Sequence, residues 1–208
     1  MRNDFGIEEL KMKQIVLASK NIDKVKEMRL VLKNLPLEIL SLADFNNMPD
    51  AVEDGKTFED NALIKARFFQ KCTGLACLAD DSGLEVDALN KMPGVYSARF
   101  AGYHADDATN NQKLLDELAK IGVTESKAAY RCALAFIDND GTEILTSGSI
   151  NGTIKTVAKG SGGFGYDPYF YIDDNRTMAQ ISVDEKNLIS HRGAALRLMA
   201  DKLKERFN

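Results

Sequence analysis

A short apolar run, residues 75–79, leads directly into two acidic residues, Asp80 and Asp81, and then into Ser82 and Gly83. A run of this length and composition predicts a buried strand of an α/β sheet. Ligands of such sheets bind beyond the carboxyl ends of the strands, so we expect the two acids at a binding site. Buried carboxylates need a cation or hydrogen-bond donors, and Mg²⁺ is a cation that prefers oxygen ligands.

The geometry of a strand separates the two acids. Neighbouring side chains point to opposite faces, so Asp80 and Asp81 reach one metal ion only if the chain turns at Ser82 and Gly83. We expect the strand to end here, with Asp81 facing the site and Asp80 bracing the loop. The alternative is a solvated turn after a strand, which this motif alone leaves equally open.

The composition excludes several classes of protein. The chain has 208 residues, 44% of them hydrophobic and 28% charged, which suits one globular unit with a sizeable core. A formal net charge of -4 argues against nucleic-acid binding through a basic surface. Cys72, Cys77 and Cys132 form no C-x-x-C pair, so we expect reduced thiols of a cytoplasmic protein and no zinc site. No apolar stretch approaches membrane-spanning length.

Hydrophobic periodicity predicts strands and helices that alternate early in the chain, followed by a late hairpin. We expect residues 1–12 to form a short extension and residues 13–208 a single two-lobed domain. The expected strands are 15–18, 37–40, 75–79, 83–88 as an edge strand, 130–137, 144–150 and 169–172, with a turn or bulge at 151–152. The expected helices begin after Asn21, Thr57, Asp106 or Asp107, and Ser190. This order predicts an α/β fold in which helices flank a mixed sheet.

The segment between the first strand and the first helix is a candidate phosphate site. Asn21 suits the N-cap position, and the N–H groups and dipole at a helix start favour an anion. Lys20 and Lys24 add positive charge, and Ser19 adds a hydroxyl. The segment has no P-loop pattern, which argues against a Walker-type kinase or ATPase. The alternative is an ordinary capped helix with surface lysines.

A second candidate group combines Glu53 with Asn61 and Lys65. Asn61 and Lys65 are four residues apart, so they share a helix face. A lysine near a helix start is unfavourable unless an anion lies beside it. A bound anionic ligand would explain Lys65, whereas a solvated lysine and a solvent-facing Glu53 are the alternatives.

A glycine-rich loop, residues 160–168, is a third candidate. It contains a formal G-x-G-x-x-G, but it leads into an apparent strand and therefore does not fit the dinucleotide fingerprint. We expect its glycines to let the backbone approach a ligand closely. Phe164 and Tyr166 can present ring faces to a base, and Asp167 can accept from its N–H groups. The alternative is a glycine-rich hairpin with core aromatic residues.

Cations at the start of the last helix form the fourth group. His191 and Arg192 follow the expected cap Ser190, at a helix end that disfavours positive charge unless an anion or carbonyl oxygen is present. The arginine fork suits a phosphate or a base carbonyl, and Lys186 lies just upstream. The only other histidine, His104, is expected at the surface.

In this order, the four groups resemble the inosine triphosphate pyrophosphatase family, the Ham1-like proteins. The match covers nearly the whole chain after residue 12. The matching segments are Leu17-Ala18-Ser19-x-Asn21-x-x-Lys24, Glu53-x-Gly55-x-Thr57-Phe58-x-x-Asn61-Ala62-x-x-Lys65-Ala66, Ala79-Asp80-Asp81-Ser82-Gly83-Leu84, Pro93-Gly94-x-Tyr96-Ser97-Ala98-Arg99, Gly162-Gly163-Phe164-Gly165-Tyr166-Asp167-Pro168 and Ser190-His191-Arg192-Gly193.

The resemblance implies Mg²⁺-dependent hydrolysis of ITP, dITP and XTP to the monophosphate and pyrophosphate. It also implies an elongated mixed sheet, a cleft between two lobes and a homodimer. By the same resemblance Glu53 and Asp81 are metal ligands, with Asp81 also the proton acceptor, and Lys65 and Ser82 contact substrate. The implied triphosphate loop is Ser19, Lys20, Asn21, Ile22, Asp23 and Lys24, and the implied base pocket is Phe164, Gly165, Tyr166, Asp167, Lys186, His191 and Arg192.

The sequence departs from the family pattern in the phosphate loop, and two other functions remain open. Lys20 and Asp23 stand where many family members have glycine, and Ser19 replaces a common threonine while keeping the hydroxyl. A pyrophosphatase for modified pyrimidine nucleotides and a nucleotide-binding module without activity are the two alternatives. The presence of both Glu53 and Asp81 argues against the second.

Overall fold

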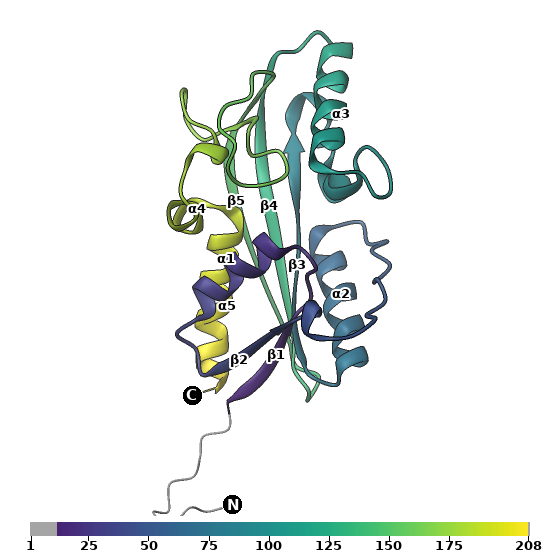
Figure 1. Ribbon diagram of the computed structural model, residues 1–208, viewed down its shortest axis with the longest axis vertical. Coiled ribbons are helices and arrows are strands. Elements are labelled where there is room, and N and C mark those ends of the chain that lie inside the picture. Colours follow the sequence, from purple (N-terminus) through teal and green to yellow (C-terminus); the bar gives the residue numbers. More distant parts are fainter. Residues whose placement is uncertain (1–11, 208) are drawn as a thin grey trace, which may run out of the picture.

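The computed structural model describes residues 12–207, which form one curved six-stranded sheet with helices on its faces (Figure 1). The strand order is β2-β1-β3-β4-β5-β6; β1 pairs in parallel with β2 and β3, and the remaining pairs are antiparallel. The strands are β1 (Lys13–Leu17), β2 (Leu37–Ser41), β3 (Ala76–Val86), β4 (Glu125–Ile137), β5 (Glu143–Lys155) and β6 (Phe170–Tyr171). The helices are α1 (Ile22–Leu32), α2 (Phe58–Thr73), α3 (Asp107–Lys120), α4 (Val183–Ile189) and α5 (His191–Phe207). The predicted α/β fold with a mixed sheet is confirmed.

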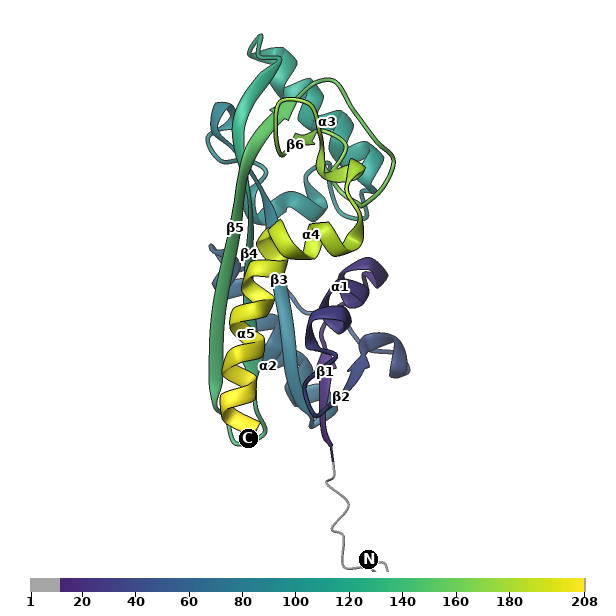
Figure 2. The same cartoon turned by 90° about the vertical axis from the view of Figure 1, so that its left-hand side faces the viewer.

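The lower part of the sheet is buried on both faces. α2 covers one face, and α1 with α5 covers the other (Figures 1 and 2). The strands alternate accordingly: Leu78 packs toward α1 and α5, whereas Cys77 and Ala79 pack toward α2. Continuous apolar strands are typical of a sheet covered on both sides.

The upper part has its own core beneath α3. Leu114 and Leu118 of α3 pack on residues of β3, β4 and β6, such as Leu84, Tyr130 and Phe170. The long strands β3, β4 and β5 run through both parts, so the molecule is elongated along them (Figure 2). Side chains near the middle of β3 therefore lie where the two lobes meet.

The predicted helix starts are confirmed by their caps. Asn21 Oδ1 accepts from the N–H groups of Asp23 and Lys24, and Thr57 forms a capping box with Asp60. Asp106 caps α3, and Ser190 Oγ accepts from the N–H of Gly193 at 3.0 Å.

The expected end of the strand at residue 79 is wrong. β3 continues through both acids to Val86, and β4 pairs with it along the way. Gly83 is needed for a close approach and not for a turn: a Cβ there would lie 2.4 Å from the carbonyl oxygen of Gly94 and 2.5 Å from Ser97 Oγ. The 3₁₀ segment 94–99 therefore packs directly against the strand.

Two smaller expectations also differ. Residues 151–152 form no turn, because β5 continues to Lys155. A Cβ on Gly152 would lie 2.7 Å from the ring of Phe170, so this glycine leaves room for β6, which pairs antiparallel with β5. The strand expected over 169–172 has only two residues, 170–171. The expected N-terminal extension lies, apart from residue 12, outside the described residues.

Candidate active site

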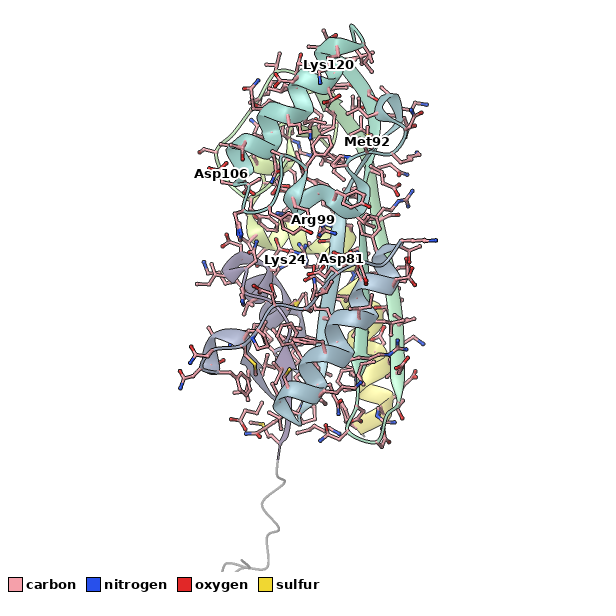
Figure 3. All side chains as sticks on the ribbon, turned by 90° about the vertical axis from the view of Figure 1, so that its right-hand side faces the viewer. Lys24, Asp81, Met92, Arg99, Asp106 and Lys120 are labelled. Atoms are coloured by element: carbon pink, nitrogen blue, oxygen red, sulfur yellow. The ribbon has the colours of Figure 1, made fainter. Side chains whose placement is uncertain are left out.

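β3 sends its two acids to opposite faces of the sheet. Asp80 lies on the same face of β3 as Leu78 and points toward α1 and α5, whereas Asp81 points toward α2. The chain does not turn at Ser82 and Gly83, so the two acids do not reach one metal ion. Figure 3 shows Lys24, Asp81 and Arg99 midway along the molecule, between α2 and the lobe that carries α3.

Asp80 is a fully paired buried carboxylate. Its Oδ2 lies 3.0 Å from Lys24 Nζ and 3.3 Å from the Arg192 guanidinium, and Ser82 Oγ donates to it at 3.2 Å. Burial raises the pKa of Asp80, but Lys24 and Arg192 outweigh burial and hold this pKa well below its usual range. Asp80 therefore braces the site, as predicted, although it joins two helices and not a loop.

Asp81 is buried with much weaker compensation. Asn61 Nδ2 donates to its Oδ2 at 3.1 Å, and no ion pair within residues 12–207 includes it. Burial raises the pKa of Asp81 to about 6; Lys65 and Lys24 oppose this rise, and Glu53 adds to it. A carboxylate with this pKa titrates close to neutral pH, which suits a group that accepts a proton.

Lys65 joins the two acidic segments. Its Nζ lies 2.9 Å from Glu53 Oε2 and donates to the backbone oxygen of Asp80 at 3.1 Å. Burial lowers the pKa of Lys65, but the charges of Glu53, Asp80 and Asp81 together raise it by more. The pKa of Lys65 is therefore above its usual value. Arg99 donates to the backbone oxygen of Glu53 at 3.0 Å and holds that loop in place. The anionic neighbours expected beside Lys65 are thus partly supplied by the protein.

The start of α1 is already capped by its own side chains. Ser19 Oγ accepts from the N–H of Asn21 at 3.2 Å, and Asn21 Oδ1 accepts from two further N–H groups. Lys20 pairs with the exposed Asp50 at 2.6 Å. Asp23 pairs with Lys26 at 3.3 Å and Ile22 is 67% exposed. Lys24 alone of this segment reaches a buried carboxylate.

Two cavities meet at α1. The larger, of about 710 Å³, is lined among others by Ser19, Lys20, Asn21, Lys24, Glu53, Lys65, Asp80 and Arg99. The smaller, of about 110 Å³, is lined by Asn21, Lys24, Ser82, Phe164, Gly165, Tyr166, Asp167, Lys186, His191 and Arg192, with other residues. Asn21 and Lys24 line both. Of the predicted site residues, Ile22, Asp23 and Asp81 line neither.

The glycine loop is held by Asp167. This carboxylate accepts from Tyr130 Oη at 3.1 Å, from the N–H of Phe164 at 3.0 Å and from Lys186 Nζ at 2.7 Å. Lys186 Nζ also lies 4.2 Å from the centroid of the Phe164 ring. The loop opens no helix, as predicted.

His191 is buried and uncharged. Its ring stacks on Tyr130 with centroids 4.8 Å apart, and its Nδ1 has no hydrogen-bond partner in the described part of the chain. Burial, and after it the charges of Arg192, Lys186 and Lys24, hold the pKa of His191 well below its usual range. A neutral imidazole offers one donor and one acceptor.

Arg192 is engaged by protein carboxylates. Its Nη1 lies 2.7 Å from Glu27 Oε2, and its Nη2 donates to Ser82 Oγ at 2.8 Å, besides the contacts with Asp80. The anion expected beside this cation is thus supplied by the protein. Glu27 also lies 3.3 Å from Lys186, so it links the two buried cations.

Three residues of this site were not predicted from the sequence. Glu27 is only 4% exposed on the buried side of α1, and its neighbours Val25 and Met28 could have indicated a buried carboxylate in need of cations. Tyr130 carried no such signal, because a strand tyrosine usually serves a core. His104, expected at the surface, is exposed but lines the larger cavity.

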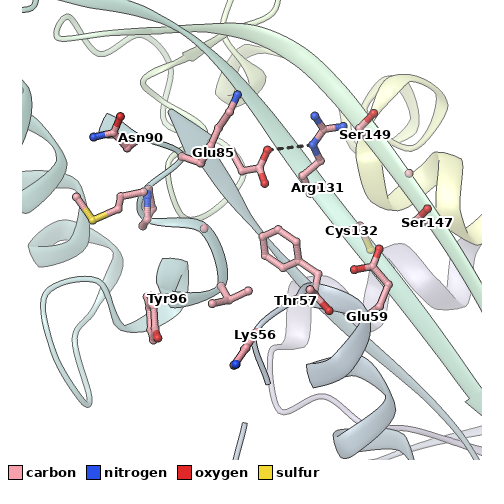
Figure 4. A pocket seen from close by; sticks show the side chains of 17 residues that line it. Lys56, Thr57, Glu59, Glu85, Asn90, Tyr96, Arg131, Cys132, Ser147 and Ser149 are labelled. Atoms are coloured by element: carbon pink, nitrogen blue, oxygen red, sulfur yellow. Dashed lines mark hydrogen bonds and ion pairs between the residues drawn. The ribbon is translucent and has the colours of Figure 1, made fainter. Parts of the chain in front are cut away.

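A third cavity, of about 670 Å³, contains none of the predicted site residues. Thr57, Glu85, Tyr96, Arg131 and Ser149 are among its lining, and Glu85 pairs with Arg131 at 3.2 Å (Figure 4).

Comparison with known proteins places this arrangement in a family. The family model described as Ham1 family matches residues 15–202. The chain belongs to the Ham1 family. The resemblance found in the sequence is confirmed.

Curated relatives match along almost their whole length. The dITP/XTP pyrophosphatase of Geobacter sulfurreducens is 48% identical over 193 residues, which cover 92% of this chain and 97% of the relative. The dITP/XTP pyrophosphatase of Bacillus anthracis is 46% identical, with 94% and 98% covered.

Solved structures agree with the fold. A HAM1 protein from Coxiella burnetii is similar with a TM-score of 0.84 and 43% identity, covering 93% of this chain and all of that one. A structure of nucleoside-triphosphatase, dITP/XTP pyrophosphatase, from Mycobacterium abscessus has a TM-score of 0.70 and 46% identity, covering 89% and 98%.

Two features are absent from residues 12–207. No helix there is long and apolar enough to cross a membrane. No group of three or more His, Cys, Asp and Glu side chains is arranged around a common metal position in that range. Mg²⁺ needs no such group, because it is often held by one or two carboxylates together with substrate phosphates.

Proposed function

We propose that this chain hydrolyses ITP, dITP and XTP to the nucleoside monophosphate and pyrophosphate, which clears these purines from the nucleotide pool. The observation that carries the proposal is the pair of cavities joined at Asn21 and Lys24. One is bordered by an aromatic glycine loop, and the other by lysines and carboxylates. A nucleoside triphosphate has the same two ends, a flat base and a run of anionic phosphates.

Mg²⁺ suits the two carboxylates beside Lys65. Glu53 and Asp81 offer carboxylate oxygens, and both lie close enough to Lys65 to raise its pKa. Asp81 is buried without an ion pair among the described residues, so a cation beside it would offset the desolvation that raises its pKa. Glu53 and Asp81 would hold the ion, which when bound neutralises charge on the phosphates.

The protein side chains supply the remaining chemistry. Asp81 accepts the proton of a water molecule whose oxygen attacks the α-phosphorus. The bond from that phosphorus to the bridging oxygen breaks, and pyrophosphate leaves with the electron pair. Lys24 and Lys65 stabilise the negative charge that grows on the leaving group. Asp80 and Arg192 keep Lys24 and Ser82 in position.

Base selection follows from hydrogen-bond polarity. Hypoxanthine and xanthine present a 6-oxo acceptor and an N1–H donor, and adenine reverses both. A mismatched base leaves buried polar groups unpaired, at about 1–3 kcal/mol each. Because Asp167 and Arg192 already have protein partners, we assign the base edge to neutral His191 and the backbone of the glycine loop.

The test is pyrophosphate release from ITP, dITP, XTP, ATP and GTP, each with Mg²⁺ and with EDTA. We expect metal-dependent turnover of the first three far above the last two. Turnover without this preference would overturn the base pocket and keep the catalytic site. Nucleotide binding without turnover of any of them would favour a binding module, and turnover of modified pyrimidine nucleotides alone would favour the other alternative.

We also propose a homodimer in a reducing, cytoplasmic environment. Cys72, Cys77 and Cys132 are free thiols. Met92 and Tyr96, which line the third cavity, are 46% and 58% exposed and leave two large side chains for a second copy to contact. Light scattering on the purified chain tests the homodimer, since a monomer mass at micromolar concentration would contradict it.

A further inference from the structure

Two side chains of α3 bind the backbone N–H and C=O of one glycine in the glycine loop, residues 160–168, here called the base loop. Asp107 Oδ2 accepts from the N–H of Gly165 at 2.6 Å, and Asn111 Nδ2 donates to the Gly165 oxygen at 2.8 Å. The two side chains are four residues apart and therefore share one helix face. We propose that Asp107 and Asn111 are positioning residues that fix the shape of the base pocket by holding the backbone of Gly165. This inference rests on the proposed function.

Gly165 needs such support. Its φ is +63°, and Gly160 and Gly163 of the same loop also have positive φ. Glycines in this conformation lose much backbone entropy when they are fixed, so a loop that contains three of them needs contacts to hold one shape. Gly165 separates Phe164 from Tyr166, and its two hydrogen bonds therefore fix the backbone from which both rings project.

The same turn of α3 also holds a second segment, residues 98–101, beside the smaller cavity. Asn110 donates to the oxygen of Ala98 at 3.2 Å and accepts from the N–H of Ala101 at 2.8 Å. Ala98 lines both cavities, and Asn110 and Asp107 line the smaller one. One helical turn thus holds both the base loop and the segment that contains Ala98, and both of them line the smaller cavity.

The contacts predict a particular kinetic signature. Asp107 and Asn111 are bonded to the base loop, whereas Lys24, Lys65 and Asp81 serve the phosphates. Loss of the α3 contacts therefore weakens base binding, and it leaves the chemical step unchanged once substrate is bound. A side chain that only stabilised the fold would lower the unfolding temperature and the amount of active enzyme, without changing KM or the order of substrates.

The experiment compares Asp107→Ala, Asn111→Ala and the double variant with Asp116→Asn, an exposed carboxylate on the same helix whose partner is Gln112. We expect KM for ITP to rise about tenfold in each single variant, the loss of one hydrogen bond, with kcat within about twofold. The ratio of kcat/KM for ITP over GTP falls in the same variants. Asp116→Asn stays at the wild-type values.

Two further measurements separate the outcomes. Asp107→Asn keeps an acceptor oxygen for the Gly165 N–H, so it restores most of the KM lost in Asp107→Ala. Because both residues act on one glycine, the double variant loses less than the product of the single effects. Unchanged KM and selectivity in both alanine variants would overturn the inference, as would a fall in kcat alone.

Failure of the proposed function is visible elsewhere. If the wild-type chain did not turn over ITP, binding of IMP measured by calorimetry would still test the positioning. We expect Asp107→Ala to weaken IMP binding about tenfold and Asp116→Asn to leave it unchanged. Equal IMP affinity in wild type and Asp107→Ala would overturn the positioning role, whatever the turnover.

Discussion

Lys186 Nζ lies 2.7 Å from Asp167 Oδ2, and both side chains are at least 95% buried. The pair joins α4 to the glycine loop, and Asp167 in turn accepts from Tyr130 and from the backbone of Phe164. A buried charge is tolerated only while its partners are present, so removal of one member leaves the other uncompensated. The shape of the base pocket therefore depends on an ion pair between two side chains of the protein, which is present without a ligand.

Lys186→Met tests this dependence. We expect the free energy of unfolding to fall by about 3–5 kcal/mol, because Asp167 and Glu27 lose a buried cation. Lys202→Met removes an exposed lysine of α5 and should change it by less than about 0.5 kcal/mol. Urea unfolding of both variants gives the comparison. Equal stability of the two would show that the buried pair does not hold the loop.

The two acids of β3 should respond differently to the same substitution. Asp81→Asn is expected to lower kcat by on the order of 10³ or more, because the proton acceptor is lost. It should not destabilise the fold, since burial raises the pKa of Asp81 and the charged form is disfavoured. Asp80→Asn should destabilise, because Lys24 and Arg192 lose a buried partner.

Measurement of kcat and urea stability for both variants checks this contrast. Normal turnover in Asp81→Asn would remove it from the mechanism. A strongly destabilised Asp81→Asn combined with a stable Asp80→Asn would reverse the roles assigned to the two carboxylates.

Much of the fold follows from local sequence signals. Apolar runs and caps such as Asn21 and Thr57 locate the strands and helices, and they depend on interactions within a few residues. Residues 75–79 and 83–88 were predicted as two strands and not as one continuous β3, because Asp-Asp-Ser-Gly between them has the composition of a turn. Its extended form depends on β4 beside it and on the close approach of residue 94 to Gly83, which are both distant contacts.

In the candidate site too, local signals could be predicted from the sequence, whereas contacts between distant residues could not. Clusters such as Lys186, His191 and Arg192 could be recognised because cations at a helix start need an explanation. Their partners could not be assigned, because Glu27 lies 165 residues before Arg192 in the chain. Only the packing of α1 against α5 brings them together, so the sequence identifies the charges without showing which of them neutralise each other.

Protonation of His191 should destabilise the protein in mild acid. The pKa of this imidazole is held well below 6.5 in the fold, chiefly by burial, and is close to 6.5 in the unfolded chain. Below pH 6.5 the unfolded state therefore binds a proton that the folded state does not. Stability should fall with decreasing pH by up to about 1.4 kcal/mol per pH unit from this group.

Urea unfolding between pH 7.5 and about pH 5 measures this slope. His191→Gln should flatten it, whereas His104→Gln, at the exposed second histidine, should leave it unchanged. The same slope in wild type and His191→Gln would contradict the assignment of a buried neutral imidazole.

The acid limb of the activity profile should report Asp81. In the free enzyme burial raises the pKa of Asp81 to about 6, so below this pH a growing fraction of enzyme carries a protonated carboxyl that cannot accept a proton from water. We expect kcat/KM for ITP, which reports groups of the free enzyme, to fall about tenfold per pH unit well below pH 6. The kcat profile should fall at lower pH, because a cation held by Glu53 and Asp81 favours the ionised form. Asp81→Glu keeps a carboxylate in a different place, so its acid limb should shift while any acid limb that belongs to the nucleotide stays. An identical limb in wild type and Asp81→Glu would assign the titration to another group.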